Sequence, residues 1–182
     1  MTPRKIAIVG AECVGKTSLC VALAEGIPAT WIAEVVREFC VARGRTPRQD
    51  EQHGILEAQV AREADAVRRA ATAGHAWVLC DSAPILTALY SRHYFDDDSL
   101  VAPARIHHRS YAATLLLMPD LPWVADGILR DGPTVRRAVH DALSGLLDDS
   151  GIEVHPIAGS GEARRQGALA VLRTICNNPS QR

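Results

Sequence analysis

Apolar and polar positions along the chain follow two alternating patterns, which predict strands separated by helices. The segments between the strands carry apolar residues three and four positions apart, and the longest such pattern runs from about Gln49 to Ala73. Short apolar runs of the kind found in buried parallel strands occupy residues 5–9, 30–33, 76–80, 112–118 and 152–157. This alternation predicts an α/β fold, with a parallel sheet covered by helices on both faces.

Two groups of polar residues in the predicted helices are interpreted as ordinary structural features. The charged residues between Gln49 and Ala73, Glu63 among them, are expected to form the solvated face of that helix. His107 and His108 are adjacent on a short predicted helix, so they point in different directions and are not expected to bind a metal together.

Composition narrows the class of protein without identifying a function. The 182 residues suit one domain spanning residues 1–182, and the net charge of −1 gives no reason to expect a nucleic-acid or anionic-membrane surface. No apolar run approaches the roughly 20 residues that a membrane helix needs. The first strand begins near the N-terminus without a secretory signal, so we expect a cytoplasmic protein. Five scattered cysteines do not suggest a disulfide framework or a zinc site.

The strongest chemical signal lies between the first strand and the first helix. It fits the pattern G-x-x-x-x-G-K-[ST] and reads Gly10, Ala11, Glu12, Cys13, Val14, Gly15, Lys16 and Thr17, followed by Ser18. Glycines let the backbone approach a polyphosphate, while loop N–H groups and the helix N-terminus supply positive potential. Lys16 is expected near the β- and γ-phosphates, and Thr17 is placed to bind Mg²⁺. The loop therefore predicts a site for a nucleotide polyphosphate.

Polar residues after the second and third strands extend this site. Asp81 directly follows an apolar strand, the Walker-B arrangement that supports a magnesium ion. Ser82 follows it, where motor ATPases usually carry a glutamate that activates water, so transfer to a bound acceptor is favoured. Glu34 and Arg37 follow the second strand, and parallel strands bind ligands at their carboxyl ends. We expect Glu34 to accept the acceptor's proton and Arg37 to bind an oxygen of the acceptor or of a phosphate; a surface ion pair is the alternative.

A segment rich in proline and glycine after the fourth strand predicts a lid at about residues 119–137. It holds Trp123 and Asp126, which we expect to contact the acceptor. It also holds Arg130, which is expected to close over the transferred phosphoryl group.

With these motifs in view, the chain resembles the ribosylnicotinamide kinase domain of NadR-type proteins. The diagnostic stretches are residues 122–127, which read P-W-V-A-D-G, and residues 34–38, which read E-V-V-R-E. The resemblance covers nearly the whole chain. In this family an aromatic residue tends to precede the glutamate after strand two, whereas this chain has Ala33 there. Trp31 lies two residues earlier, on the same side of the strand, and is a candidate replacement.

The resemblance implies a three-layer P-loop fold with sheet order 2-3-1-4-5. It also implies transfer of a phosphoryl group from ATP to the 5′-hydroxyl of nicotinamide riboside, with Thr17 and Asp81 organising Mg²⁺. Two alternatives stay open: a kinase for another nucleoside or vitamin alcohol, and a nucleotide-dependent regulatory ATPase. Neither lysine supplies a guanine-recognition motif, so a GTPase is not expected.

Overall fold

The computed structural model describes residues 2–124 and 132–177, and its centre is a five-stranded parallel sheet. The strands lie in the order β2-β3-β1-β4-β5, which confirms the predicted order. Their bounds are β1 Arg4–Val9, β2 Ala29–Ile32, β3 Trp77–Asp81, β4 Ala113–Leu117 and β5 Val154–Ile157. Every residue of β3 and β4 is buried, as expected for strands covered on both faces.

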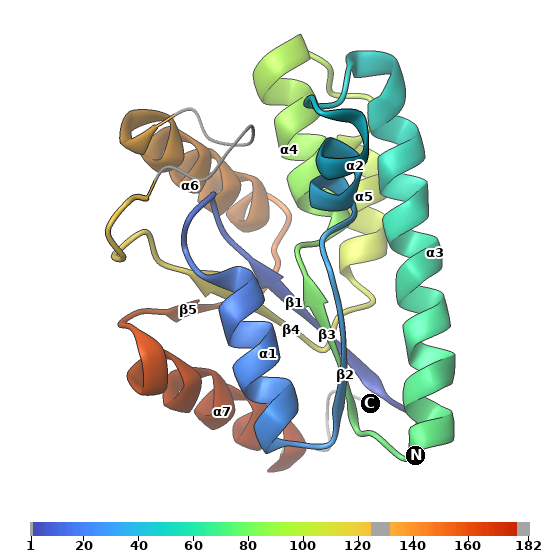
Figure 1. The fold of residues 1–182 in the computed structure, drawn as a ribbon, viewed down its shortest axis with the longest axis vertical. Coiled ribbons are helices and arrows are strands. Elements are labelled where there is room, and N and C mark those ends of the chain that lie inside the picture. The colour runs from blue at the N-terminus through green and yellow to red at the C-terminus, as the bar shows by residue number, and fades with distance from the viewer. Residues whose placement is uncertain (1, 125–131, 178–182) are drawn as a thin grey trace.

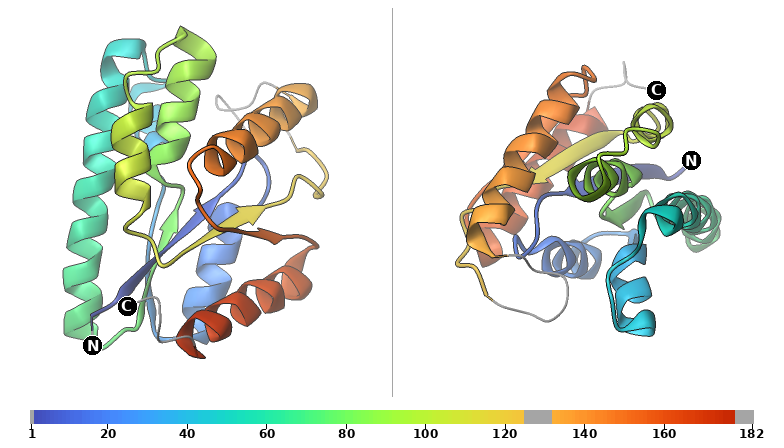
Figure 2. Two further views of the ribbon diagram at one scale, coloured as in Figure 1. Left: turned by 180° about the vertical axis from the view of Figure 1, so that it is seen from behind. Right: turned by 90° about the horizontal axis from the view of Figure 1, so that it is seen from above.

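Helices cover both faces of the sheet and give three layers (Figure 1). Helices α1 and α7 pack together on one face, and α3, α4, α5 and α6 occupy the other (Figure 2). Helix α2 lies at the carboxyl edge of the sheet, against α3. The helix bounds are α1 Lys16–Gly26, α2 Val35–Arg43, α3 Gln49–Ala73, α4 Pro84–Phe95, α5 Val101–His108, α6 Pro133–Asp148 and α7 Gly161–Asn177.

The predicted elements are found within a few residues of their expected positions. Helix α3 spans the predicted residues, because its apolar repeat is long. The helix is capped by Gly74, whose φ of 69° is the left-handed conformation common at helix ends. The N-cap residue of α4 is Ala83. In the described part of the chain, none of the helices has the length and apolar composition needed to cross a bilayer.

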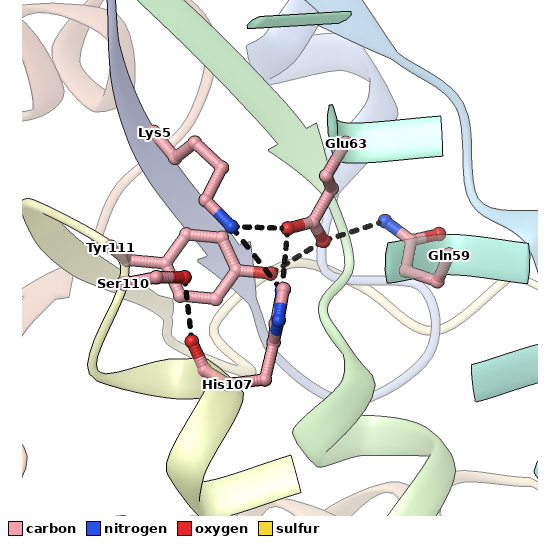
Figure 3. Close-up of polar contacts among 6 residues, drawn as sticks. All are labelled: Lys5, Gln59, Glu63, His107, Ser110 and Tyr111. Carbon is pink, nitrogen blue, oxygen red and sulfur yellow. Dashed lines mark hydrogen bonds and ion pairs between the residues drawn. The ribbon is translucent and has the colours of Figure 1, made fainter. Parts of the chain in front are cut away.

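One prediction about α3 is wrong: Glu63 is fully buried and does not lie on a solvated face. Figure 3 shows its carboxylate at the centre of a polar cluster near the amino edge of the sheet. The Lys5 ammonium and His107 Nε2 each lie 2.8 Å from Oε2. The Tyr111 hydroxyl donates to Oε1 at 2.5 Å, and the Gln59 amide donates to the same atom at 3.2 Å. The cluster therefore joins α3 to β1 and to the end of α5.

The surroundings of Glu63 decide its protonation. Burial alone would raise the pKa of Glu63, but His107, Lys5 and Tyr111 stabilise the carboxylate, and the net result is a pKa below the ordinary value. Because the folded-state pKa is lowered, the ionised carboxylate stabilises the fold above the unfolded-state pKa. That stabilisation is lost as the pH falls through the folded-state pKa.

We predict that Glu63→Gln lowers the free energy of unfolding by about 3 kcal/mol at pH 7, because the Lys5 ammonium loses its buried partner. Urea denaturation measures the change. The gap between the wild type and the variant should narrow as the pH falls below about 4.3, the ordinary pKa of a glutamate in the unfolded chain, and continue to narrow until the pH passes the lowered folded-state pKa.

The matched control is Glu57→Gln on the same helix. Glu57 is exposed and pairs with His53, so its substitution should change stability by less than about 0.5 kcal/mol. Equal effects of the two substitutions would contradict a special role for the buried carboxylate.

Candidate active site

The phosphate loop joins β1 to α1 at the carboxyl edge of the sheet. Gly10 has a φ of 152°, and a Cβ there would lie 2.9 Å from the Val14 side chain and 3.0 Å from the Leu117 carbonyl oxygen. Gly15 has a φ of 82° and sits at the N-cap of α1. Both positions therefore require glycine, for space at the first and for conformation at the second.

Lys16 begins α1 and folds back over the loop. Its ammonium donates to the carbonyl oxygen of Gly10 at 3.1 Å and to that of Ala11 at 2.9 Å. The side chain therefore lies over the loop, where its charge is placed to interact with a bound polyphosphate.

Thr17 and Asp81 meet because β1 and β3 are neighbours in the sheet. The Thr17 hydroxyl donates to Asp81 Oδ2 at 2.5 Å. The other oxygen, Oδ1, is buried and has no hydrogen-bond partner among the described residues. Burial raises the pKa of Asp81; the Glu34 charge adds to this effect, and Lys16 opposes it. A hydroxyl beside an unpartnered carboxylate oxygen is the type of ligand set that Mg²⁺ prefers.

Glu34 and Arg37 lie at the carboxyl end of β2, as predicted. Glu34 is the N-cap residue of α2, and its carboxylate is 4.0 Å from Arg37 Nε. The Glu34 side chain is 12% exposed, whereas that of Arg37 is 45% exposed. Both residues line a cavity that also reaches Lys16, so the structure brings these three predicted site residues together.

The cavity has a volume of about 580 Å³ and lies between the phosphate loop, α2, the start of α3 and α4. Basic side chains outnumber acidic ones in its lining. Its lining consists of Glu12, Cys13, Lys16, Glu34, Val36, Arg37, Arg45, Thr46, Pro47, Arg48, Gln52, Ser82, Leu86, Thr87, Tyr90, Tyr94 and Phe95.

Sequence reasoning missed one wall of this cavity. Tyr90 and Tyr94 are one turn apart on α4 and stack with ring centroids 6.0 Å apart, and Phe95 packs edge-on against Tyr94. Gln52, at the start of α3, is only 4% exposed and also lines the cavity. The sequence feature that could have predicted this wall is the four-residue spacing of the tyrosines on the helix after Asp81, because residues four apart share one helix face. For Gln52 the sequence held no signal.

The two tryptophans that were expected to contact the acceptor, Trp31 and Trp123, do not line the described cavity. Trp31 is partly buried against the hydrophobic core and does not line the cavity. Trp123 is half-buried and also absent from the described lining. The next residue, Val124, accepts a hydrogen bond from the Cys13 thiol at 3.3 Å, so the start of the lid segment touches the phosphate loop. Asp126 and Arg130 lie outside the described residues.

The glycine loop, the Thr17–Asp81 pair and the strand order together define a P-loop nucleotide-binding domain. A family model described as an AAA domain matches residues 5–164, so the chain belongs to the AAA domain family. The sequence finds no match among curated proteins.

Solved structures support the same fold. NadR in complex with NR superposes with a TM-score of 0.78 and 20% identity, over 97% of this chain and 52% of that chain. NadR in complex with NAD and AMP-PNP superposes with a TM-score of 0.77 and 18% identity, over 97% of this chain and 50% of that chain. Thymidylate kinase from Ehrlichia chaffeensis superposes with a TM-score of 0.62 and 14% identity, over 96% of this chain and 100% of that chain. The chain thus spans about half the length of the NadR structures, and the predicted resemblance is confirmed for the fold.

We predict that Lys16→Ala raises the Kd for ATP by roughly tenfold or more, because it removes the ammonium placed over the loop. Calorimetric titration measures the change. Arg173→Ala, which removes an exposed positive charge from the last turns of α7, should change the Kd by less than about twofold. Equal ATP affinity in the wild type and Lys16→Ala would show that the loop does not hold the nucleotide.

Proposed function

We propose that the protein is an ATP-dependent kinase that phosphorylates the 5′-hydroxyl of nicotinamide riboside and yields nicotinamide mononucleotide, a step of NAD salvage. The observation that carries the proposal is one cavity, lined by Lys16 of the phosphate loop and by Glu34 and Arg37 after β2. The likeness to NadR in complex with NR supports the choice of acceptor. We further propose that residues 1–182 form a single kinase domain whose lid lies at about 119–137.

The donor half of the site is the phosphate loop, residues Gly10 to Ser18. Its N–H groups and the N-terminus of α1 would hold the ATP phosphates, with Lys16 beside the β- and γ-phosphates. Thr17 and Asp81 would hold Mg²⁺, since the unpartnered Asp81 Oδ1 offers it a buried oxygen. When bound, the metal ion would offset negative charge on the transferred phosphoryl group.

The acceptor half is the part of the cavity between α2, α3 and α4. The rings of Tyr90 and Tyr94 offer a flat apolar wall to a planar heterocycle, and the buried Gln52 amide offers a hydrogen-bonding group. Trp123 and Asp126 would contact the acceptor from the lid.

The proposed transfer needs one base and one phosphoryl donor. The acceptor hydroxyl oxygen bonds to the γ-phosphorus, the bond from that phosphorus to the leaving ADP oxygen breaks, and the hydroxyl proton passes to Glu34. Arg37 would bind an acceptor oxygen, and Arg130 would offset charge on the moving phosphoryl group. Asp81 is the alternative base, because it is buried beside the phosphate loop and burial raises its pKa above the ordinary value.

The direct test is an acceptor panel. With Mg-ATP and nicotinamide riboside, the wild-type chain should form ADP and riboside monophosphate in a one-to-one ratio, as measured by liquid chromatography with mass detection. Product from another nucleoside or vitamin alcohol, but none from nicotinamide riboside, would retain the kinase and reject this substrate. ATP hydrolysis that no acceptor stimulates would instead favour a regulatory ATPase.

We predict that Glu34→Gln lowers kcat by about a hundredfold or more and leaves the Kd for ATP within about threefold, because the amide cannot take the acceptor proton. Glu38→Gln is the matched control on α2, since Glu38 is paired with Arg62 at 2.6 Å outside the cavity. Unchanged turnover in Glu34→Gln would make Asp81 the next candidate base.

A further inference from the structure

Arg164, in the first turns of α7, is a buried arginine that the proposed transfer does not use. It is 3% exposed, although arginine is rarely buried without partners. Its guanidinium donates to the Val14 carbonyl oxygen in the phosphate loop, to the Met118 carbonyl oxygen after β4 and to Asp120. One side chain therefore ties together three segments that are far apart in the sequence.

The contact with Val14 fixes the orientation of one peptide plane in the loop. A trans peptide directs its carbonyl oxygen and the following N–H to opposite sides. Because the Val14 oxygen faces Arg164, the N–H of Gly15 faces away from it, across the loop. Residues that alternate between right-handed and left-handed conformations direct successive N–H groups to one concave side, the nest that binds anions. Cys13 and Gly15 both have the positive φ of the left-handed members.

Asp120 in turn fixes Arg164. One carboxylate oxygen accepts from the guanidinium, and the other accepts from the backbone N–H of Gly159 at 2.6 Å. The neighbouring stretch is held as well, because Arg136 donates to the carbonyl oxygens of Leu121 at 2.9 Å and Pro119 at 3.2 Å. The loop packs closely on this assembly: a Cβ on Gly15 would lie 3.3 Å from Leu121.

We propose that Arg164 is a positioning residue for phosphate binding, which holds the Val14–Gly15 peptide in the orientation that directs an N–H toward the anion. Asp120 keeps the guanidinium in place. The inference rests on the phosphate-binding half of the proposed function and is independent of the acceptor. Its ligand class is therefore any polyphosphate, with or without a nucleoside.

The experiment compares Arg164→Met with Arg165→Met, a matched control on the same helix. Arg165 also reaches α1, where its Nε donates to the Ala22 carbonyl oxygen at 3.2 Å, but it does not contact the loop. Kd values for ATP, for inorganic tripolyphosphate and for nicotinamide riboside are measured by calorimetry, well below the unfolding temperature of each variant.

Arg164→Met should raise the Kd for ATP and for tripolyphosphate by roughly tenfold to a hundredfold, with the riboside Kd within about threefold. Arg164→Lys should recover part of the loss, since an ammonium can still donate to the Val14 oxygen. Arg165→Met should bind all three ligands as the wild type does. Lost thermal stability with unchanged polyphosphate affinity would overturn the proposal, because a merely structural role predicts that result.

If Arg164→Met does not fold, Asp120→Asn decides the question. It keeps the arginine but weakens the contact that fixes it, so it should raise the Kd for both polyphosphates, and unchanged values would overturn the proposal. A wild-type chain that binds neither polyphosphate would overturn this inference and the ATP site together. Intact ATP binding without phosphoryl transfer to the riboside would reject the acceptor alone.

Discussion

The hydrogen bond between the Thr17 hydroxyl and the Asp81 carboxylate is the contact on which the site depends. It exists because β3 lies beside β1, with Ile8 and Asp81 in register and the Ser82 N–H bonded to the Ile8 carbonyl oxygen at 3.0 Å. A buried carboxylate is costly unless it is paired, so this pair needs the neighbouring strands and the phosphate loop to be in place together. The sheet order is therefore a condition for the site as well as a description of the fold.

From that contact the two halves of the proposed reaction extend in different directions. The donor side is built from backbone groups of one loop, and Arg164 donates a hydrogen bond to the Val14 carbonyl oxygen in that loop. The acceptor side is built from side chains of α2, α3 and α4 around one cavity. The donor side therefore depends on the conformation of a short segment, and it suits any nucleoside triphosphate. The acceptor side depends on which side chains project into the cavity, and this is where the choice of substrate must lie.

Local pattern was enough to predict the strands, the extent of α3 and the phosphate loop, because each depends on residues close in sequence. The positions of Glu34 and Asp81 also followed, since carboxyl ends of parallel strands share one edge. The buried cluster of Glu63 could not be predicted, because its partners Lys5 and Tyr111 lie 58 and 48 residues away. For the same reason no local pattern indicated that Arg164 reaches Val14, 150 residues away.

The proposed function requires the phosphate donor and the acceptor to meet between the loop and the cavity. A crystal structure of the wild-type chain with AMP-PNP, Mg²⁺ and nicotinamide riboside would show whether they do. We expect the riboside in the cavity, with its 5′-oxygen about 3–3.5 Å from the γ-phosphorus and within hydrogen-bond distance of Glu34 or Asp81. A riboside bound outside the cavity, or a 5′-oxygen directed away from the phosphate, would contradict the proposed function.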